Sequence, residues 1–175
     1  MSSVTILCLD CGYTAHYHPS QLDQNCPQCG GEWREARYDY AALGRQLPAR
    51  LAERPFNLWR YRELLPVRQI HPQLFLGEGG TPLLRAVNLG LMLGLPNIFI
   101  KDERHGPTSS FKDRQAAVGI SALKEAGITE AVLASTGNVA IAYSAFAARA
   151  GIKLWAFLTS LVPAEKMREV AIYGT

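Results

Sequence analysis

From residue 97 onward, short apolar segments alternate with longer segments of helical periodicity, and this alternation restricts the fold more than any other feature of the 175-residue chain. The expected strands are residues 98–100, 131–134 and 154–158. The expected helices are residues 113–126, 138–150 and 163 to about 173, the first two ending at glycines. Strands that alternate with helices predict an α/β fold in which helices flank a parallel sheet.

Residues 41–76 have a different character, because they are rich in Arg, Leu and Pro. Prolines at positions 48, 55, 66 and 72 are expected to break any long helix. The segment is therefore predicted to be an arm that wraps the core, with one short helix around Leu58–Leu65. Its side chains Trp59, Tyr61 and Leu64 are interpreted as packing residues.

All four cysteines lie within the first 29 residues, in two pairs. Cys8 and Cys11 form one Cys-x-x-Cys pair, Cys26 and Cys29 form the other, and fourteen residues separate the pairs. Two residues between cysteines let both thiolates reach one tetrahedral ion, so we expect a closed, structural zinc site with these four ligands. Two disulfides are the alternative, which fits poorly with a chain that shows no export signal.

The two cysteine pairs predict a zinc ribbon over residues 1–37. Such a ribbon also suits a nucleic-acid-binding protein, but the segment Gly12–Asn25 between the pairs contains no lysine or arginine. Phosphate binding needs basic side chains, so we interpret the ribbon as a stabilising or docking element. His16 and His18 are not needed as metal ligands.

The composition is that of a soluble globular protein, with 48% hydrophobic and 19% charged residues. The 18 basic and 15 acidic residues give a formal charge of +3 without a block of like charges, which does not favour nucleic acid as a partner. No secretory signal is apparent at the start of the chain. The longest nearly uncharged stretch, Ala131–Ala148, contains polar residues that argue against a membrane span. Cytoplasm is the expected location.

Residues 107–114 read Pro-Thr-Ser-Ser-Phe-Lys-Asp-Arg and place a lysine where a loop turns into a helix. Ser110 is expected to be the N-cap, with Asp113 completing a capping-box-like pair. Lys112 then lies in the first turn, where the positive end of the helix dipole favours the neutral amine that can attack a carbonyl. On spacing alone, an ordinary surface lysine is the simpler interpretation.

The Ser110–Arg114 segment nevertheless resembles the cofactor-lysine motif of pyridoxal-phosphate enzymes of the tryptophan-synthase β-like group (fold type II), and of the threonine synthases in particular. One departure is visible, because Gly106 and Ser109 stand where this family often has asparagine and glycine. A zinc ribbon at the N-terminus also resembles one subgroup of threonine synthases. Four further segments resemble motifs of the family and follow its order: Leu58–Pro66, Gly77–Leu83, Lys101–Glu103 and Ser135–Asn138.

The resemblance implies the conversion of O-phospho-L-homoserine and water to L-threonine and phosphate. Lys112 would hold pyridoxal 5'-phosphate as a Schiff base and move protons at the substrate's α and β carbons. Phe111 and Asn138 would contact the cofactor, Asn138 through a hydrogen bond to the ring oxygen. The residues expected to bind substrate are Ser135, Thr136, Gly137 and Lys101. The first three would receive its carboxylate at a helix N-terminus, and the lysine its phosphate.

The same resemblance divides the chain into a zinc ribbon (1–37), an N-terminal arm (38–76) and the amino-terminal part of the catalytic core (77–175). The glycine-rich loop that holds the cofactor phosphate in this family is not found, since Gly79 and Gly80 belong to a different motif. We therefore expect an enzyme fragment that is inactive in isolation. A homo-oligomer is compatible with this assignment.

Two alternatives remain open. One is another fold type II enzyme, such as a serine/threonine dehydratase or a cysteine-synthase-like enzyme, which the ribbon and the Leu58–Pro66 segment disfavour. The other is an inactive zinc-ribbon interaction module. The Ser135–Asn138 segment also has a simpler interpretation as a helix-capping turn.

Overall fold

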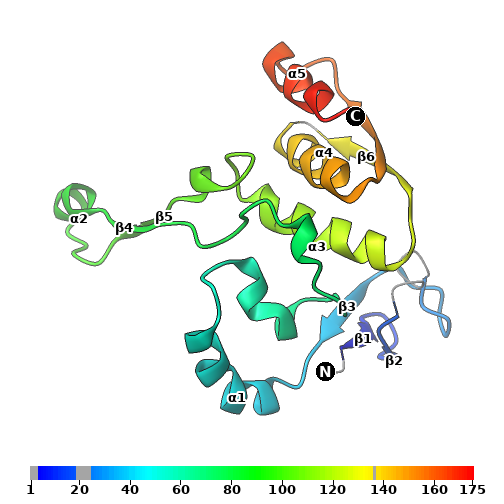
Figure 1. Cartoon of the computed structure of the whole chain (residues 1–175). Helices are drawn as coiled ribbons and strands as arrows, with labels where there is room; N and C mark the ends of the chain where they lie inside the picture. The colour runs from blue at the N-terminus through cyan, green and yellow to red at the C-terminus, as the bar shows by residue number, and fades with distance from the viewer. Residues whose placement is uncertain (1–3, 19–24, 136) are drawn as a thin grey trace.

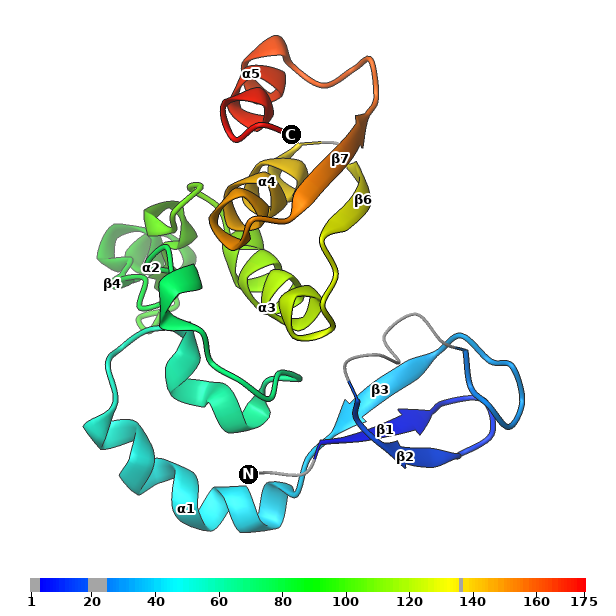
Figure 2. The same cartoon turned by 45° about the vertical axis from the view of Figure 1, so that its right-hand side comes forward.

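The computed structural model describes residues 4–18, 25–135 and 137–175. Near the N-terminus, strands β1 (Thr5–Cys8), β2 (Thr14–His16) and β3 (Arg34–Arg37) form an antiparallel sheet in the order β2-β1-β3. Figure 2 shows this small sheet at one end of the molecule, with α1 leading away from it. A unit of this size buries little apolar surface, so a bound metal would contribute much of its stability.

The arm contains a longer helix than the sequence predicts. Helix α1 (Tyr40–Glu53) continues through Pro48, although proline removes a backbone donor and crowds the preceding turn. The helix tolerates this residue because it lies at the surface, with Leu43 as its one buried residue. Asp39 also caps the helix by accepting a hydrogen bond from the Ala42 amide at 2.8 Å. The expectation that prolines exclude a long helix here is wrong.

Two short 3₁₀ helices follow, Leu58–Leu64 and Pro72–Leu74, and the first confirms the expected short helix. Trp59 is buried, which confirms it as a packing residue. Tyr61 is exposed instead, and its ring contacts a neighbouring guanidinium, while Leu64 is half-buried.

Polar contacts join the arm to both of its neighbours. The backbone amides of Arg68 and Gln69 donate to the Glu125 carboxylate at the end of α3. The Arg68 guanidinium donates to the carbonyl of Tyr17, which follows β2. The arm therefore links the N-terminal sheet to the helical core.

Residues 83–101 correct one part of the predicted topology. Strand β5 (Phe99–Lys101) is expected in the parallel sheet, but it pairs antiparallel with β4 (Leu83–Arg85). Helix α2 (Val87–Leu93) joins the two strands, and its one buried residue is Gly90. Parallel strands are joined by a crossover helix that covers a face of the sheet. Helix α2 does not cover a sheet face, in agreement with the antiparallel pairing of the strands it joins. This unit projects from the rest of the molecule (Figure 1), and every residue of both strands is exposed.

The alternation of strands and helices is confirmed further along the chain. The elements are α3 (Lys112–Glu125), β6 (Glu130–Ser135), α4 (Asn138–Ala150), β7 (Lys153–Leu158) and α5 (Ala164–Ile172), all close to the predicted bounds. Strands β6 and β7 pair in parallel, from Glu130 opposite Lys153 to Ser135 opposite Leu158. The α/β class is thus confirmed, and the parallel sheet is confirmed for these two strands.

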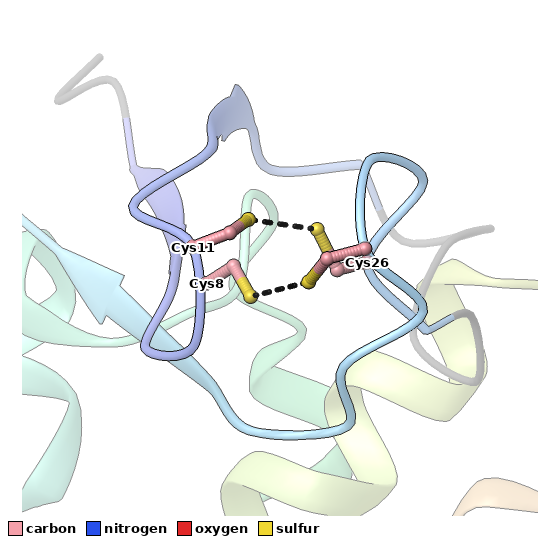
Figure 3. A group of neighbouring side chains, drawn as sticks. Cys8, Cys11 and Cys26 are labelled. Carbon is pink, nitrogen blue, oxygen red and sulfur yellow. Dashed lines mark hydrogen bonds between the residues drawn. The ribbon is translucent and has the colours of Figure 1, made fainter.

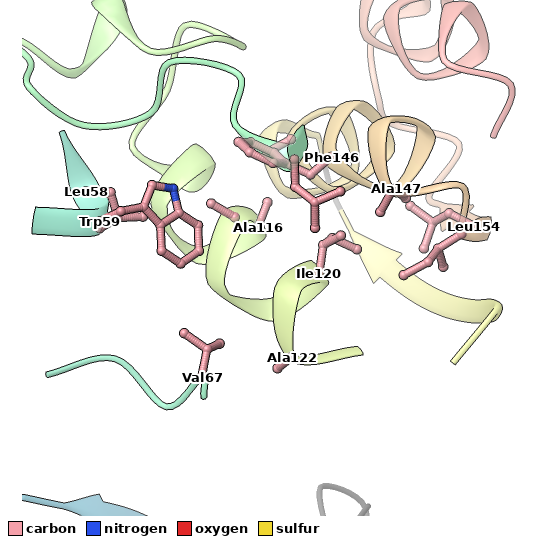
Figure 4. Packing of buried hydrophobic residues seen from close by; sticks show 14 residues of the cluster. Leu58, Trp59, Val67, Ala116, Ile120, Ala122, Phe146, Ala147 and Leu154 are labelled. Atoms are coloured by element: carbon pink, nitrogen blue, oxygen red, sulfur yellow. The ribbon is translucent and has the colours of Figure 1, made fainter. Parts of the chain in front are cut away.

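The core lies where α3 and α4 pack together, with α4 also covering one face of the β6–β7 sheet. Figure 4 shows Ile120 of α3 and Phe146 of α4 in this cluster, with Leu154 of β7 at one end and Trp59 of the arm at the other. Alanines such as Ala116 allow the two helices to approach closely. None of the helices in the described ranges is long and apolar enough to span a membrane.

Candidate functional site

The four cysteines predicted to be metal ligands come together at one end of the N-terminal sheet. Cys8 ends β1, Cys11 follows it in a turn, and Cys26 and Cys29 lie before β3, all as free thiols. The Cys8 and Cys29 sulfur atoms are 3.7 Å apart, as are those of Cys11 and Cys26 (Figure 3). All four lie within 4.8 Å of one another. Tetrahedral metal–sulfur bonds of about 2.3 Å place sulfurs about 3.8 Å apart, so the set fits a four-thiolate metal site.

Both cysteine pairs lie in the same kind of turn. In each, the glycine after the second cysteine donates its N–H to the carbonyl of the first, at 3.0 Å for Gly12 and 2.8 Å for Gly30. Their φ angles of +76° and +74° are rarely adopted by other residues.

Burial raises the pKa of Cys26, but hydrogen bonds from the backbone of Cys29 and Gln28, together with those from the Cys11 and Cys8 side chains, lower that pKa to about 7. The N–H···S bonds favour the thiolate, which is the form that binds metal. Against hydrogen bonds from the backbone, the neighbouring thiols and burial raise the pKa of Cys29 and Cys11, so the four cysteines share their protons unequally.

Lys112 begins helix α3, and the capping predicted there is confirmed in part. Phe111 occupies the cap position of the helix, but the Ser110 hydroxyl accepts a hydrogen bond of 3.4 Å from the Lys112 amide, as the sequence predicts. The predicted pairing of Asp113 with the cap is wrong. Asp113 instead accepts hydrogen bonds from the amide of Thr108, at 3.0 Å, and from its hydroxyl. The carboxylate of α3 thus fixes the preceding loop, which is a tertiary role that the capping pattern does not reveal.

The same loop contains the two departures from the family motif, Gly106 and Ser109. A Cβ atom at Gly106 would lie 2.3 Å from Asp113 Oδ2, so a larger residue there would have to displace the carboxylate. Ser109 has φ +57°, in the left-handed region that favours glycine. The backbone at position 109 therefore keeps a conformation suited to the glycine that is usual there.

The Lys112 side chain is half-buried, and its Nζ lies 4.2 Å from the centre of the exposed Phe111 ring. This is a cation–π contact. Within the described ranges, no carboxylate forms an ion pair with Lys112. Among the described residues, its amine is therefore not held by an acid.

One polar network joins three segments that the sequence presents as separate motifs. Arg114, two residues after Lys112, donates two hydrogen bonds of 2.8 Å to the Glu103 carboxylate. The Thr81 hydroxyl donates to the same carboxylate at 2.7 Å, and the Lys101 ammonium donates to the Thr81 carbonyl. The Arg114 guanidinium holds the pKa of Glu103 below its ordinary value, against the opposing effect of burial. The sequence reasoning assigned no role to Thr81, Glu103 or Arg114, although each lies in a motif.

The turn at Gly77–Leu83 packs against the arm through Glu78 and two glycines. The Glu78 carboxylate is 1% exposed and accepts hydrogen bonds from the Trp59 indole N–H and, at 2.9 Å, from a nearby backbone amide. A Cβ atom at Gly79 or Gly80 would lie 2.3 or 2.1 Å from backbone atoms of the arm. These glycines therefore serve close packing of the arm.

The loop at the start of α4 carries the predicted substrate residues. The Ser135 hydroxyl accepts hydrogen bonds from the amides of Gly137, at 3.1 Å, and Ala140, at 3.2 Å, so it caps the helix. Two amides at this helix N-terminus are therefore already paired. Asn138 is exposed, and its Oδ1 accepts a hydrogen bond of 2.7 Å from the Lys166 ammonium. Thr136 lies outside the described residues.

The structure brings some of the predicted residues together and leaves others apart. The four cysteines meet, and Lys101 is linked to the lysine loop through Thr81 and Arg114. Lys112 contacts Phe111, whereas Asn138 contacts Lys166. Two hollows in the described surface lie elsewhere: one of about 310 Å³ in the ribbon, and one of about 930 Å³ between ribbon and arm.

Comparison with known proteins gives consistent results. The threonine synthase of Methanocaldococcus jannaschii is 37% identical over 169 residues, which cover 95% of this chain and 41% of that protein. The threonine synthase of Methanosarcina acetivorans is 34% identical over 160 residues, 91% of this chain and 37% of that protein. The chain thus spans about two fifths of the length of these curated relatives. The profile of the family described as "Pyridoxal-phosphate dependent enzyme" matches residues 74–175, which include the lysine loop and the start of α4. The chain therefore belongs to the pyridoxal-phosphate dependent enzyme family.

Proposed function

We propose that this chain contributes the reactive lysine of a threonine synthase-like lyase, which converts O-phospho-L-homoserine and water to L-threonine and phosphate. The observation that carries the proposal is the Ser110–Arg114 segment at the start of α3, in a chain 37% identical over 95% of its length to a protein named threonine synthase. In this proposal, residues 1–37 are a zinc ribbon, 38–76 an arm and 77–175 the amino-terminal part of the catalytic core. The activity is proposed for the whole enzyme, since the chain spans 41% of that relative.

The side chains present fit pyridoxal phosphate by their chemistry. Lys112 offers a primary amine beside an aromatic ring, and no carboxylate in the described residues forms an ion pair with that amine. An aldehyde reacts with such an amine. When bound, the cofactor supplies an electron-withdrawing ring that stabilises negative charge at the substrate carbons. Lys112 would hold the cofactor and then move protons at the substrate's α and β carbons.

Residues of the β6–α4 loop would orient cofactor and substrate. The Asn138 side chain would donate a hydrogen bond to the cofactor ring oxygen, and Phe111 would lie against the cofactor. Ser135, Thr136 and Gly137 would receive the substrate carboxylate, because a helix N-terminus attracts anions. Lys101 is proposed to bind the substrate phosphate. The hydrogen bond from its ammonium to the Thr81 carbonyl supports this role by holding the cation in place.

We also propose that Cys8, Cys11, Cys26 and Cys29 hold one zinc ion. The distances among their sulfur atoms support this proposal, as does the N–H donation to Cys26. Four thiolates would close the coordination sphere and leave no open position, so the ion would stabilise the ribbon and take no part in the reaction.

The first test uses the 175-residue chain itself. The chain is incubated with pyridoxal phosphate, reduced with borohydride and digested, and the modified peptide is identified by its mass. We expect the reduced cofactor on Lys112 and none in Lys112→Ala. Lys124→Ala is the matched control, because Lys124 lies on the same helix and donates to the Ala150 carbonyl. Modification of Lys101 or Lys124 in place of Lys112 would show that the assignment is wrong.

The second test measures turnover. The chain is fused to the carboxyl-terminal part of the Methanocaldococcus relative, and phosphate release from O-phospho-L-homoserine is followed. We expect equal amounts of phosphate and threonine from the fusion and none from the chain by itself, because its sequence lacks a glycine-rich loop for the cofactor phosphate. A fusion that deaminates serine or threonine and ignores O-phospho-L-homoserine would identify a dehydratase.

A further inference from the structure

Lys166 lies in the first turn of α5 and reaches back to the loop that starts α4. Val170, one helical turn later, is buried against Ala140 and Ile141 of α4. Residues four positions apart lie on the same side of a helix, so the packing of Val170 directs Lys166 toward α4. The Lys166 Nζ donates to Asn138 Oδ1 at 2.7 Å.

The lysine stem also covers the residue before Asn138. Gly137 is buried with φ +151°, and a Cβ atom there would lie 3.0 Å from Cδ and from Nζ of Lys166. The absence of a side chain at Gly137 thus lets the lysine pass over the loop. Together with the cap by Ser135, this contact fixes the loop from a second side.

The chemistry of this contact determines which way the Asn138 amide points. An ammonium group has three donors and no acceptor, whereas the end of an asparagine side chain carries one oxygen and one NH₂ group. Lys166 can therefore pair only with the oxygen, and the NH₂ group is directed to the opposite side. The side chain is then set to donate, as a bond to a cofactor oxygen requires.

We propose that Lys166 is a positioning residue, which fixes the orientation of the Asn138 amide so that its NH₂ group faces the cofactor. This inference rests on the proposed function, in which Asn138 binds the ring oxygen of pyridoxal phosphate. It adds a residue that lies outside the lysine motif and the α4 loop. In this proposal Lys166 acts through Asn138 and touches neither cofactor nor substrate.

The first measurement needs no cofactor. The side-chain carbonyl carbon of Asn138 is assigned by NMR in the isotope-labelled chain, since its chemical shift responds to hydrogen bonding at the oxygen. We expect this resonance to move in Lys166→Met, which keeps an unbranched stem but has no donor, and to return toward the wild-type position in Lys166→Arg. Arg168→Met, at an exposed position of the same helix, is the control and should leave it unchanged. An unchanged resonance in Lys166→Met overturns the proposal.

The second measurement is the affinity for pyridoxal phosphate of the chain fused to the carboxyl-terminal part of the Methanocaldococcus relative, followed by absorbance and checked by borohydride trapping at Lys112. We expect the dissociation constant to rise about threefold to tenfold in Lys166→Met, the effect of one hydrogen bond. The Lys166→Glu variant should bind the cofactor more weakly still. A carboxylate only accepts hydrogen bonds, so it would attract the NH₂ group of Asn138 away from the cofactor. Arg168→Glu makes the same change of charge at an exposed site of α5 and controls for repulsion of the anionic cofactor.

The outcomes separate the orienting role from a purely structural one. If Lys166 only fastens α5 to α4, the Lys166→Glu variant keeps a hydrogen bond to Asn138 and should bind the cofactor better than Lys166→Met does. That result would refute the orienting role. Wild-type binding by both variants would also refute it, while leaving labelled Lys112 as support for the proposed function. If the fusion of the wild-type chain to the carboxyl-terminal part of the Methanocaldococcus relative shows no trapped cofactor on Lys112, the proposed function fails, and the role of Lys166 fails with it.

Discussion

The contact between Trp59 and Glu78 allows a quantitative test of how the arm is fixed to the core. Trp59→Phe removes the indole N–H that donates to the buried carboxylate, while a phenyl ring can still stack on Phe75, whose ring centre is 5.1 Å from that of Trp59. A hydrogen bond to a charged acceptor is worth about 1.5–3 kcal/mol. The apolar area lost with the smaller ring adds about 1 kcal/mol. We expect the free energy of unfolding to fall by about 3 kcal/mol.

The assay is urea unfolding followed by circular dichroism, with the slope of the transition compared between variants. Trp155→Phe is the matched control, because the Trp155 indole also donates to a glutamate, Glu130 at 2.7 Å, but in an exposed position. The Trp155→Phe substitution should lower the free energy of unfolding by less than about 1 kcal/mol, as is usual for contacts at the surface. Equal costs for the two substitutions would refute the reasoning, since burial of the hydrogen bond is what should make the change at Trp59 more costly. Glu78→Gln combined with Trp59→Phe should cost less than the sum of the two single changes.

Three further outcomes can be measured on the same chain. Metal analysis should give about one zinc per chain, and the Cys11→Ser variant should contain less zinc. Two disulfides found by mass spectrometry would exclude the zinc site. Gly79→Ala should destabilise the protein, since its Cβ would clash with the arm backbone at φ +83°, and a neutral result would contradict the packing described. The pKa of Glu103 lies below its ordinary value of 4.5. The charged Glu103 carboxylate therefore stabilises the fold fully above pH 4.5, and this contribution is lost as the pH falls through the lowered pKa. The cost of Glu103→Gln should therefore shrink in acid, and a cost independent of pH would count against the Arg114 pair.

Elements set by local sequence were predicted well. Helix α4 begins and ends where its pattern indicates, because Ser135 caps it at one end and Gly151, with φ +67°, ends it at the other. The cysteine cluster could be predicted equally well, because a spacing of two residues lets both sulfur atoms of a pair face one ion. In both cases, the residues that determine the structure are neighbours in the chain.

Features set by distant residues were missed. Strand β5 has the composition of a sheet strand, but its partner β4 lies across α2, and periodicity does not tell which strand pairs with which. The Asp113 carboxylate matches a capping box by position, yet it is used by Thr108. Pro48 shows the reverse case. Proline ordinarily breaks a helix, but α1 continues through this residue, which is exposed.

The contacts around Lys112 show how the chain fixes the backbone of the proposed cofactor lysine without an ion pair to its amine in the described residues. The next two residues are both anchored, Asp113 to Thr108 in the preceding loop and Arg114 to Glu103. The backbone at Lys112 is thereby held from the loop side and from the side of β5, whereas its side chain lies against Phe111 and forms no ion pair with a carboxylate in the described residues. A reactive group needs its neighbours locked so that it presents the same geometry to each substrate. If Lys112 is the cofactor lysine, as proposed, Glu103 and Arg114 contribute to the site through the position they give to its backbone.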